Sequence, residues 1–480
     1  MVKSAVSAAV AGLLAVSAAH AANTTVYVSG ASAQRSFWQS DLGAICTGNF
    51  GTTGVTIVSV SSPDIQSAQC TVTTTGRGPV ALPAGISNND VLTMQYAAEF
   101  GSVWGIAPAV AGNAQATGRR FIDLAVGTIS DYDANTDTAG SGMIGPFVPD
   151  LLVTDIEPSK WASPDNWPYI AGEAGPDFHS LWILGIGGAT PAHNALTSAA
   201  RQPTLDELKA LISSTGFQRV NGQIFSIIVN NSGPAATLGS LSSQSVRGIL
   251  TGQYTTWGQV PEVGGSNTTP ISVVRRDHGS GTEVATSLYF TGQEIGIPGA
   301  PLVGLTNGPV AENDGNLNSP PIEKNSTNAL QAAVALDAGA IGFRGLGTSS
   351  AVTTLNLDGV QANAHNAAMG LYGYAYDTWS KNNTTASGAS AEAKVLITAL
   401  LADAANPATL PTEATGSFTG GQWVVTGTNP RRVSYAGQYS GTSPVLSACK
   451  STTTAAPKAC FKQSGTFQNA ESSRQSSNKQ

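Results

Sequence analysis

Residues Val273–Thr282 (VVRRDHGSGT) decide the fold of this chain. A β-branched run ends in two arginines, a glycine–serine turn follows, and Thr282 opens a predicted helix that runs to about Phe290. A helix N-terminus presents unpaired backbone N–H groups and a partial positive charge. An arginine at a strand end forks two N–H bonds onto an oxyanion. The segment therefore predicts a cradle for an anion; a plain strand–turn–helix connection capped by Thr282 is the alternative.

On both sides of this stretch, strand-like and helical patterns alternate. Alternation of this kind favours an α/β fold with largely parallel sheets. The predicted strands are Thr25–Ser29, Leu151–Thr154, Ile224–Asn230 and Ile271–Val274, and the predicted helices are Thr204–Ser213, Leu241–Leu250 and Asn328–Leu336.

Three other strand ends carry polar groups that suit a binding site. Ser29–Arg35 (SGASAQR) is a glycine–serine turn after the first strand, and Phe100–Gly105 (FGSVWG) is a weaker turn of the same kind. Asp155 follows the apolar run Leu151–Thr154, where a carboxylate either faces a ligand or caps the next helix.

The first residues predict export. Lys3 precedes an apolar stretch, Ala5–Ala19, and Ala19-His20-Ala21 fits a small-x-small cleavage site. We therefore expect residues 1–21 to be a signal peptide, because the apolar run is too short for a membrane anchor of roughly 20 residues. The mature protein is expected to be periplasmic or secreted.

The cysteines agree with an oxidising compartment. The chain has four of them, an even number that predicts disulfides in an exported protein. Three pairings are possible, and the local one, Cys46–Cys70 with Cys449–Cys460, closes the shortest loops. A zinc site is disfavoured because no C-x-x-C spacing occurs.

The composition limits the kinds of partner that this chain can bind. The formal net charge is −7, only 11% of the residues are charged, and no basic tract is present. Nucleic-acid binding therefore lacks its electrostatic driving force. A bound anion would have to be held by local geometry.

Four segments occur in the order expected for the phosphate-specific periplasmic binding proteins of ABC importers, which this sequence resembles. They cover about a quarter of the chain and are most similar around the arginine-containing stretch. The segments are Ser226–Asn230 (SIIVN), Val246–Trp257 (VRGILTGQYTTW), Ile271–Thr282 and Ala338–Phe343 (AGAIGF).

The resemblance implies two α/β lobes, each a doubly wound mixed sheet, joined by two crossing strands. Lobe 1 would contain residues 22–230 and 343–463, lobe 2 residues 231–342, and residues 464–480 would be a disordered tail. The function implied is capture of inorganic phosphate or a related oxyanion between the lobes, and delivery to the membrane subunits of an ABC importer. We expect a monomer without cofactor, metal or enzymatic activity.

The resemblance also implies site residues. Arg276 takes the place of the phosphate-forking arginine, and Asp155 that of the carboxylate that receives the proton of the phosphate. Ser102 matches a serine loop of the family, with Ser141 as the alternative. The remaining binding positions are Ala33 and Gln34 in the first loop and Ser280, Gly281 and Thr282 in the loop after the arginines.

The chain departs from the family at three points. Gln34-Arg35 replaces the usual Thr-Phe, His278 stands where the family has an Asp, and the serine loop lacks a double serine. A second arginine near the site would admit a larger or more highly charged anion.

Other patterns are less informative. Asp131–Asp137 has the oxygen spacing of a calcium loop, but Thr136 and Gly142 replace its Gly and Glu, so a solvated turn is favoured. Ser280 near Asp277 and His278 lacks the G-x-S-x-G elbow of a hydrolase, so a secreted phosphatase is a weaker alternative.

An adhesion or structural role of the same fold is the other alternative. Three segments look like insertions, and their roles stay open: residues 72–88, 131–142 and 163–177.

Overall fold

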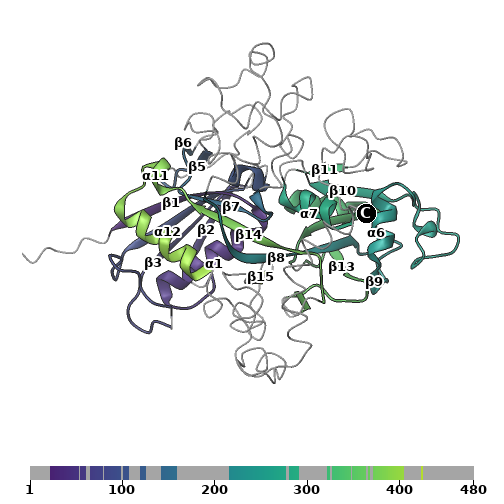
Figure 1. The fold of residues 1–480 in the computed structure, drawn as a ribbon, viewed down its shortest axis with the longest axis horizontal. Helices are drawn as coiled ribbons and strands as arrows, with labels where there is room; N and C mark the ends of the chain where they lie inside the picture. Colours follow the sequence, from purple (N-terminus) through teal and green to yellow (C-terminus); the bar gives the residue numbers. More distant parts are fainter. Residues whose placement is uncertain are drawn as a thin grey trace, which may run out of the picture.

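Two lobes lie side by side and share one long strand, β8 (Gln218–Asn230), which runs from one to the other (Figure 1). The computed structural model describes residues 22–52, 54–60, 65–78, 80–98, 101–106, 119–125, 142–158, 216–276, 280–290, 322–324, 327–347, 349–363, 366–367, 371–404 and 423–424. Within them, ten strands follow one another in the order β11-β10-β12-β8-β14-β7-β1-β4-β3-β2. Both lobes are mixed α/β structures, as predicted.

The first lobe contains the purple and light-green parts of the chain (Figure 1). β4 and β7 run parallel to β1 on its two sides, and β3 and β14 are antiparallel to their neighbours. Its strands are β1 (Asn23–Gly30), β2 (Thr56–Val60), β3 (Ile65–Thr71), β4 (Val91–Ala97), β7 (Leu151–Thr154) and β14 (Ala375–Asn382), with a separate hairpin of β5 (Arg119–Ile122) and β6 (Met143–Phe147). Its helices are α1 (Arg35–Thr47), α11 (Thr384–Ser387) and α12 (Ala391–Ala404), and short 3₁₀ helices are η1 (Ser32–Gln34) and η2 (Gly101–Gly105).

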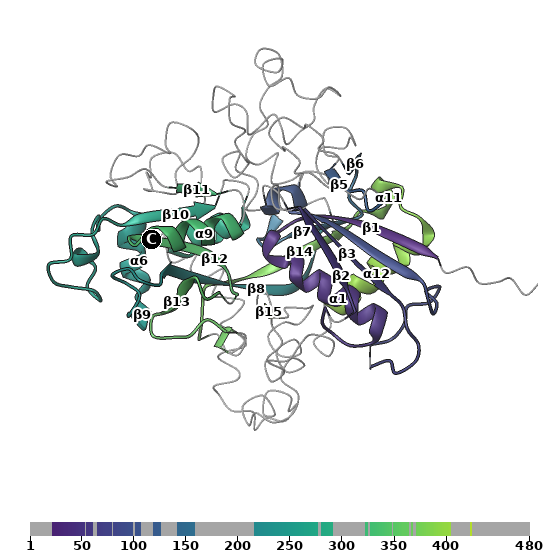
Figure 2. The same ribbon diagram turned by 180° about the vertical axis from the view of Figure 1, so that it is seen from behind.

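The second lobe is built around three parallel strands, with β10 between β11 and β12. The strands are β9 (Ser240–Leu241), β10 (Ser272–Arg276), β11 (Ile322–Lys324), β12 (Ala340–Gly345) and β13 (Val352–Leu357). The helices are α6 (Ser243–Leu250), α7 (Gly281–Phe290) and α9 (Thr327–Leu336), with the 3₁₀ turn η5 (Trp257–Gln259). α6 and α7 lie in this lobe in Figure 1, and Figure 2 shows α6 and α9 there from behind.

The lobes join through β8 and β14. The first part of β8 pairs with β14, and its last residues pair with β12 and β13. The crossing therefore lies inside β8. β13 pairs with β8 and β9, and Tyr374 and Tyr376 belong to the same hydrophobic core as Phe343. The lobe boundaries at residues 230 and 343 stay predictions. A two-residue strand, β15 (Trp423–Val424), adds to β8 at the junction.

The predicted strands and helices that fall on described residues are present. Their ends shift by one or two residues, except that β8 begins at Gln218, six residues before the predicted strand Ile224–Asn230. Leu151–Thr154 is β7, the helix predicted to begin at Thr282 is α7, and Asn328–Leu336 lies within α9. α1, α12 and the strands β2–β4 were not predicted. α1 buries polar residues such as Gln39 beside its apolar ones, which obscures its period in the sequence. α12 buries Leu396, Ile397, Leu400 and Leu401 at helical spacing, a period that the sequence analysis missed.

The first lobe has a disulfide between Cys46 of α1 and Cys70 of β3, as predicted, with 6.2 Å between the Cα atoms. It lies in a core between the sheet and the helices α1 and α12. Next to it, the guanidinium of Arg77 donates to the carbonyls of Ile45 and Cys46 near the end of α1. The insertion 72–88 is therefore tied to this helix. The predicted pair Cys449–Cys460 lies outside the described residues.

The signal peptide (1–21), the tail (464–480), the helix predicted at Thr204–Ser213 and the insertion 163–177 also lie outside the described residues, as does all but Gly142 of the insertion 131–142. Among the helices that are described, none is long and apolar enough to span a membrane.

Asp41 of α1 is a buried acid. Its side chain is 0% exposed, and neither carboxylate oxygen accepts a hydrogen bond within the described part of the chain. Burial raises the pKa of Asp41 well above 3.8, and the nearby carboxylate of Asp403 raises it further. Folding therefore takes up a proton above pH 3.8, and the free energy of unfolding falls as the pH rises from about 4.

Asp41→Asn should raise the free energy of unfolding at pH 7 by about 1–3 kcal/mol, because the variant no longer takes up a proton on folding at this position. The gain should shrink toward pH 4, because both proteins are then neutral at this position. Thermal melts between pH 4 and pH 8 measure it. Glu392→Gln removes an exposed carboxylate from α12 and serves as the control; equal effects of the two substitutions would contradict the assignment.

Candidate functional site

The carboxyl ends of the parallel strands of both lobes meet at the junction. In the first lobe, β1 is followed by η1, β4 leads to η2, and β7 ends immediately before Asp155. In the second lobe, β10, β11 and β12 end at Arg276, Lys324 and Gly345. Open α/β sheets bind ligands at such edges, and here the two edges face each other across the crossing strands.

Two glycines allow the loops of the first lobe to approach the end of β7. Gly30 has a φ of +126°, and a Cβ on Gly30 or Gly105 would overlap the carbonyl oxygen of Val153. That carbonyl accepts a hydrogen bond from the backbone N–H of Ala31 at 3.0 Å. The turn after β1 and η2 are thereby held directly beside Asp155.

Asp155 and Ser102 form the acidic part of the site. Both are buried, and the hydroxyl of Ser102 donates a short hydrogen bond to Oδ1 of Asp155. Burial raises the pKa of Asp155 to about 6, while the Ser102 hydrogen bond and the positive charge of Arg276 oppose the shift. The carboxylate is therefore mostly ionised at pH 7.5.

Helix α7 of the second lobe begins at this carboxylate. A Cβ on Gly281 would overlap Oδ1 of Asp155 and would lie 2.6 Å from Oγ of Ser102. The carbonyl of Ser280 accepts from the N–H groups of Glu283 and Val284, so Ser280 precedes the first helical residue and the helix N-terminus points at the junction. Only glycine permits this approach between the lobes.

Thr282 is buried one residue further along, and its carbonyl accepts from the hydroxyl of Thr286 at 2.6 Å. The Tyr374 hydroxyl lies 2.6 Å from Oγ1 of Thr286. Since the Thr286 proton is used toward Thr282, Tyr374 is the donor of this second bond. Burial raises the pKa of Tyr374, so it stays a neutral donor and anchors α7 to the segment that returns to the first lobe.

Arg276 reaches from the second lobe to the first. Its side chain is 1% exposed. Nε donates to the carbonyl of Lys324 at 3.1 Å, and Nη1 donates to Oγ1 of Thr327 at 3.1 Å and to Oγ of Ser32 at 3.2 Å. Ser32 lies in the turn after β1, so this arginine joins the two halves of the site.

Arg275, the other arginine of the sequence motif, points away from Arg276, because consecutive strand residues face opposite sides. Its Nη1 lies 3.3 Å from Oε1 of Glu283, in the first turn of α7, and both side chains are buried. This ion pair fixes the start of α7 relative to β10.

The structure thus brings Ser102, Asp155, Arg276, Ser280, Gly281 and Thr282 together, while it places Ala33 and Gln34 beside the crossing strands. Gln34 Nε2 donates to Oγ1 of Thr378 at 2.6 Å and to Oε1 of Gln223 at 3.3 Å. A Cβ on Gly345 would lie 2.9 Å from Cβ of Ala33. A direct ligand contact of Ala33 or Gln34 stays a prediction. Ser141, Asp277 and His278 lie outside the described residues.

Sequence reasoning missed Ser32, Thr327 and Tyr374. Ser32 lies within the glycine–serine turn noted in the sequence, and Thr327 directly precedes a predicted helix, so both could have been named as candidate site residues. No sequence pattern points to Tyr374, because its contact with α7 joins residues 88 positions apart.

Ser102→Ala should raise the pKa of Asp155 above its value of about 6, because the hydroxyl stabilises the ionised carboxylate. The measurement is an NMR titration of the Asp155 carboxyl carbon between pH 4 and pH 9. Ser59→Ala, on the exposed edge strand β2, is the control. An unchanged pKa in Ser102→Ala would show that the contact does not act on Asp155.

Comparison with known proteins places the chain in a family. The model of the PBP superfamily domain matches residues 193–448, more than half of the chain. No curated protein matches it.

Several solved structures are similar at low identity. One is a putative phosphate ABC transporter substrate-binding protein with bound phosphate from Clostridium perfringens, with 13% identity and a TM-score of 0.40, covering 78% of this chain and 93% of that one. Another is an ABC-type phosphate transport receptor from Vibrio cholerae, with 20% identity and a TM-score of 0.28, covering 38% and 66%. A third is a phosphate-binding protein from Stenotrophomonas maltophilia, with 19% identity and a TM-score of 0.26, covering 35% and 57%.

All three TM-scores are below 0.5, so the ligand named for each remains a property of that protein. The family match covers all of β8, the second lobe and the returning strand β14. The two-lobed arrangement around β8 agrees with it. This chain is a member of the PBP superfamily.

Proposed function

We propose that this chain is an exported solute-binding protein that captures a small oxyanion, in particular phosphate, between its lobes and delivers it to an ABC importer. The observation that supports this most is the meeting of Asp155 and the N-terminus of α7 with Arg276 at one place. The proposal includes no chemical reaction on the ligand.

Each group has a complementary role toward a protonated oxyanion. The guanidinium of Arg276 and the N–H groups at the start of α7 donate to ligand oxygens. The carboxylate of Asp155 accepts the proton of the ligand, because an ionised carboxylate has no proton to donate. Phosphate near neutral pH carries such a proton, and sulfate does not.

Closure is part of the proposal. Gly281 of the second lobe touches Asp155 of the first, and Arg276 binds Ser32 across the junction. A ligand held by groups from both lobes favours the state in which they meet, through hinge motion of the crossing segments.

Arg276→Ala should weaken phosphate binding by at least about thirtyfold, since removing one partner of a buried charge pair costs about 2–5 kcal/mol. Titration calorimetry at pH 7.5 measures the dissociation constant, and a thermal melt checks the fold. Arg247→Ala, on the exposed side of α6, removes the same charge and should leave binding unchanged. Binding by Arg276→Ala within twofold of the wild type would refute the site.

Discrimination between phosphate and sulfate should depend on pH. Above about pH 6 the ionised Asp155 would face an oxygen of sulfate that carries no proton, so the two groups form no hydrogen bond. This contact should make sulfate bind about a hundredfold more weakly than phosphate. Below that pH the carboxylic acid donates, and the preference for phosphate should shrink. Competition titrations at pH 5 and pH 8 measure it.

Asp155→Asn is the matched variant for this experiment, because its amide donates at every pH. It should bind sulfate at pH 8 and lose the pH dependence. Equal binding of both anions by the wild type at pH 8 would contradict the role of Asp155.

A further inference from the structure

A second arginine, Arg344 near the end of β12, is buried. Its side chain is 4% exposed. Nη1 donates to Oε1 of Gln331 and Nη2 to the carbonyl of Gly347, both neutral acceptors, and Nε is buried with no hydrogen-bond partner among the described residues. Within the described part of the chain no carboxylate forms an ion pair with it, and burial lowers the pKa of Arg344.

Such an arginine is costly unless an anion compensates it. Removing a guanidinium from water without an opposite charge is unfavourable, and a neutral amide and a carbonyl recover only part of the lost hydration. None of the contacts described for the proposed site involves Arg344. The lack of a counter-charge among the described residues around Arg344 therefore points to a negatively charged ligand.

Arg344 lies next to Arg276. β10 and β12 are parallel neighbours, with Val274 opposite Gly342, and the same register carried two residues further sets Arg276 beside Arg344. Both side chains extend over the face covered by α9, where Arg276 binds Thr327 and Arg344 binds Gln331, one helical turn later. Neighbouring strands are about 4.8 Å apart, so the two arginine side chains extend from adjacent backbone positions.

The site of the first lobe is also adjacent. Gly345 follows Arg344 directly and contacts Ala33, while Arg276 contacts the preceding Ser32. The turn after β1 therefore lies against the ends of both β10 and β12.

We infer that Arg344 is the second positive charge of the anion site and makes it prefer oxyanions with two or more negative charges. The inference rests on the proposed function of the site. With Asp155 ionised, its charge offsets that of Arg276, and Arg344 leaves the site net positive. The ligand class is a multiply charged phosphoric oxyanion, of which pyrophosphate is the most highly charged probe and dimethyl phosphate the least.

The test is titration calorimetry at pH 7.5 with pyrophosphate, phosphate and dimethyl phosphate. The wild type should bind them in that order of decreasing affinity. Arg344→Gln should raise the dissociation constant by on the order of tenfold for each negative charge on the ligand. The loss of affinity should therefore be largest for pyrophosphate and smallest for dimethyl phosphate. Arg344→Lys keeps the charge and should stay within about threefold of the wild type for all three.

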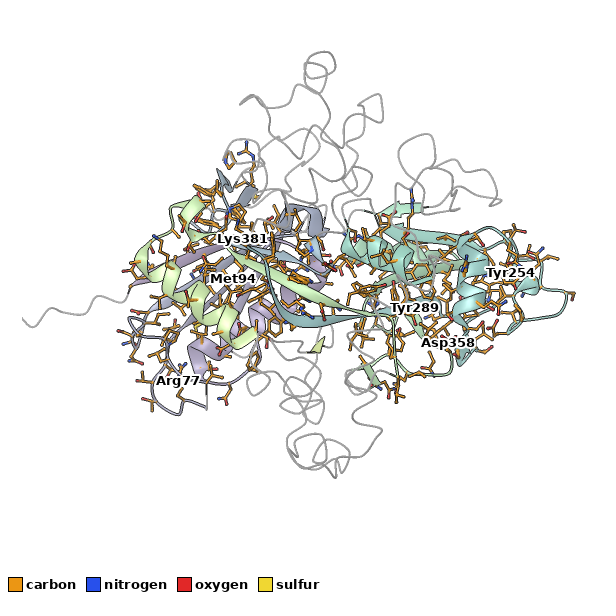
Figure 3. All side chains as sticks on the ribbon, viewed as in Figure 1. Arg77, Met94, Tyr254, Tyr289, Asp358 and Lys381 are labelled. Carbon is orange, nitrogen blue, oxygen red and sulfur yellow. A yellow bond between two sulfur atoms is a disulfide. The ribbon has the colours of Figure 1, made fainter. Side chains whose placement is uncertain are left out.

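Arg77→Gln is the control. Arg77 also binds backbone carbonyls, but it lies at the outer part of the first lobe, away from the junction (Figure 3). The Arg77→Gln variant should have a lower melting temperature and unchanged dissociation constants for all three anions.

The outcomes separate the two proposals. If Arg344→Gln weakens the three anions equally, or none of them, Arg344 has a structural role and the inference fails while the site stands. If the folded wild type binds none of them, or binds them equally well after Arg276→Ala, the proposed function itself fails. If Arg344→Gln does not fold, the wild-type series decides: dimethyl phosphate bound as tightly as pyrophosphate overturns the inference.

Discussion

The hydrogen-bond ladder of β8 is the constraint on which the rest of the structure depends. Buried backbone groups must be paired, and β8 meets this requirement by pairing with β14 in one lobe and with β12 and β13 in the other. Its thirteen residues are buried from Val220 onward. Because one strand belongs to both sheets, the carboxyl ends of β1, β4 and β7 are directed toward those of β10, β11 and β12. Every residue of the candidate site stands at one of these ends.

Desolvation sets the electrostatics at this junction. The same burial that raises the pKa of Asp155 lowers that of Arg344, since each charged form loses water. Charges in such a place interact more strongly than on the surface, so a small number of groups decides which anion is stable there. The ion pair of Arg275 with Glu283 is already compensated and holds α7. Asp155 and Arg276 carry the charges that meet at the junction, and Arg344 is the second positive charge that we propose for it.

Polar contacts link the site loops to the crossing strands. Gln34 hydrogen-bonds Thr378 of β14 and Gln223 of β8, and Tyr374 holds Thr286 of α7 just before β14 begins. A change in the angle between the lobes therefore moves the turn after β1 and the start of α7 together. This coupling gives ligand-induced closure a physical route from the site to the hinge.

The sequence alone determined the parts whose physics is local. The β-branched run before Arg276, the glycine–serine turn and the capping position at Thr282 specified β10, the loop and α7, because strand propensity and helix capping act over a few residues. Asp155 was predicted for the same reason, since it follows a short apolar strand. Only the tertiary structure decided which side chains meet. The contact of Gly281 with Asp155 and Ser102, the reach of Arg276 to Ser32 and the position of Arg344 beside it join residues more than fifty positions apart, and no local period encodes such pairings. The pairing of β13 with β8 and β9 was equally hidden, because it joins segments that lie far apart in the chain.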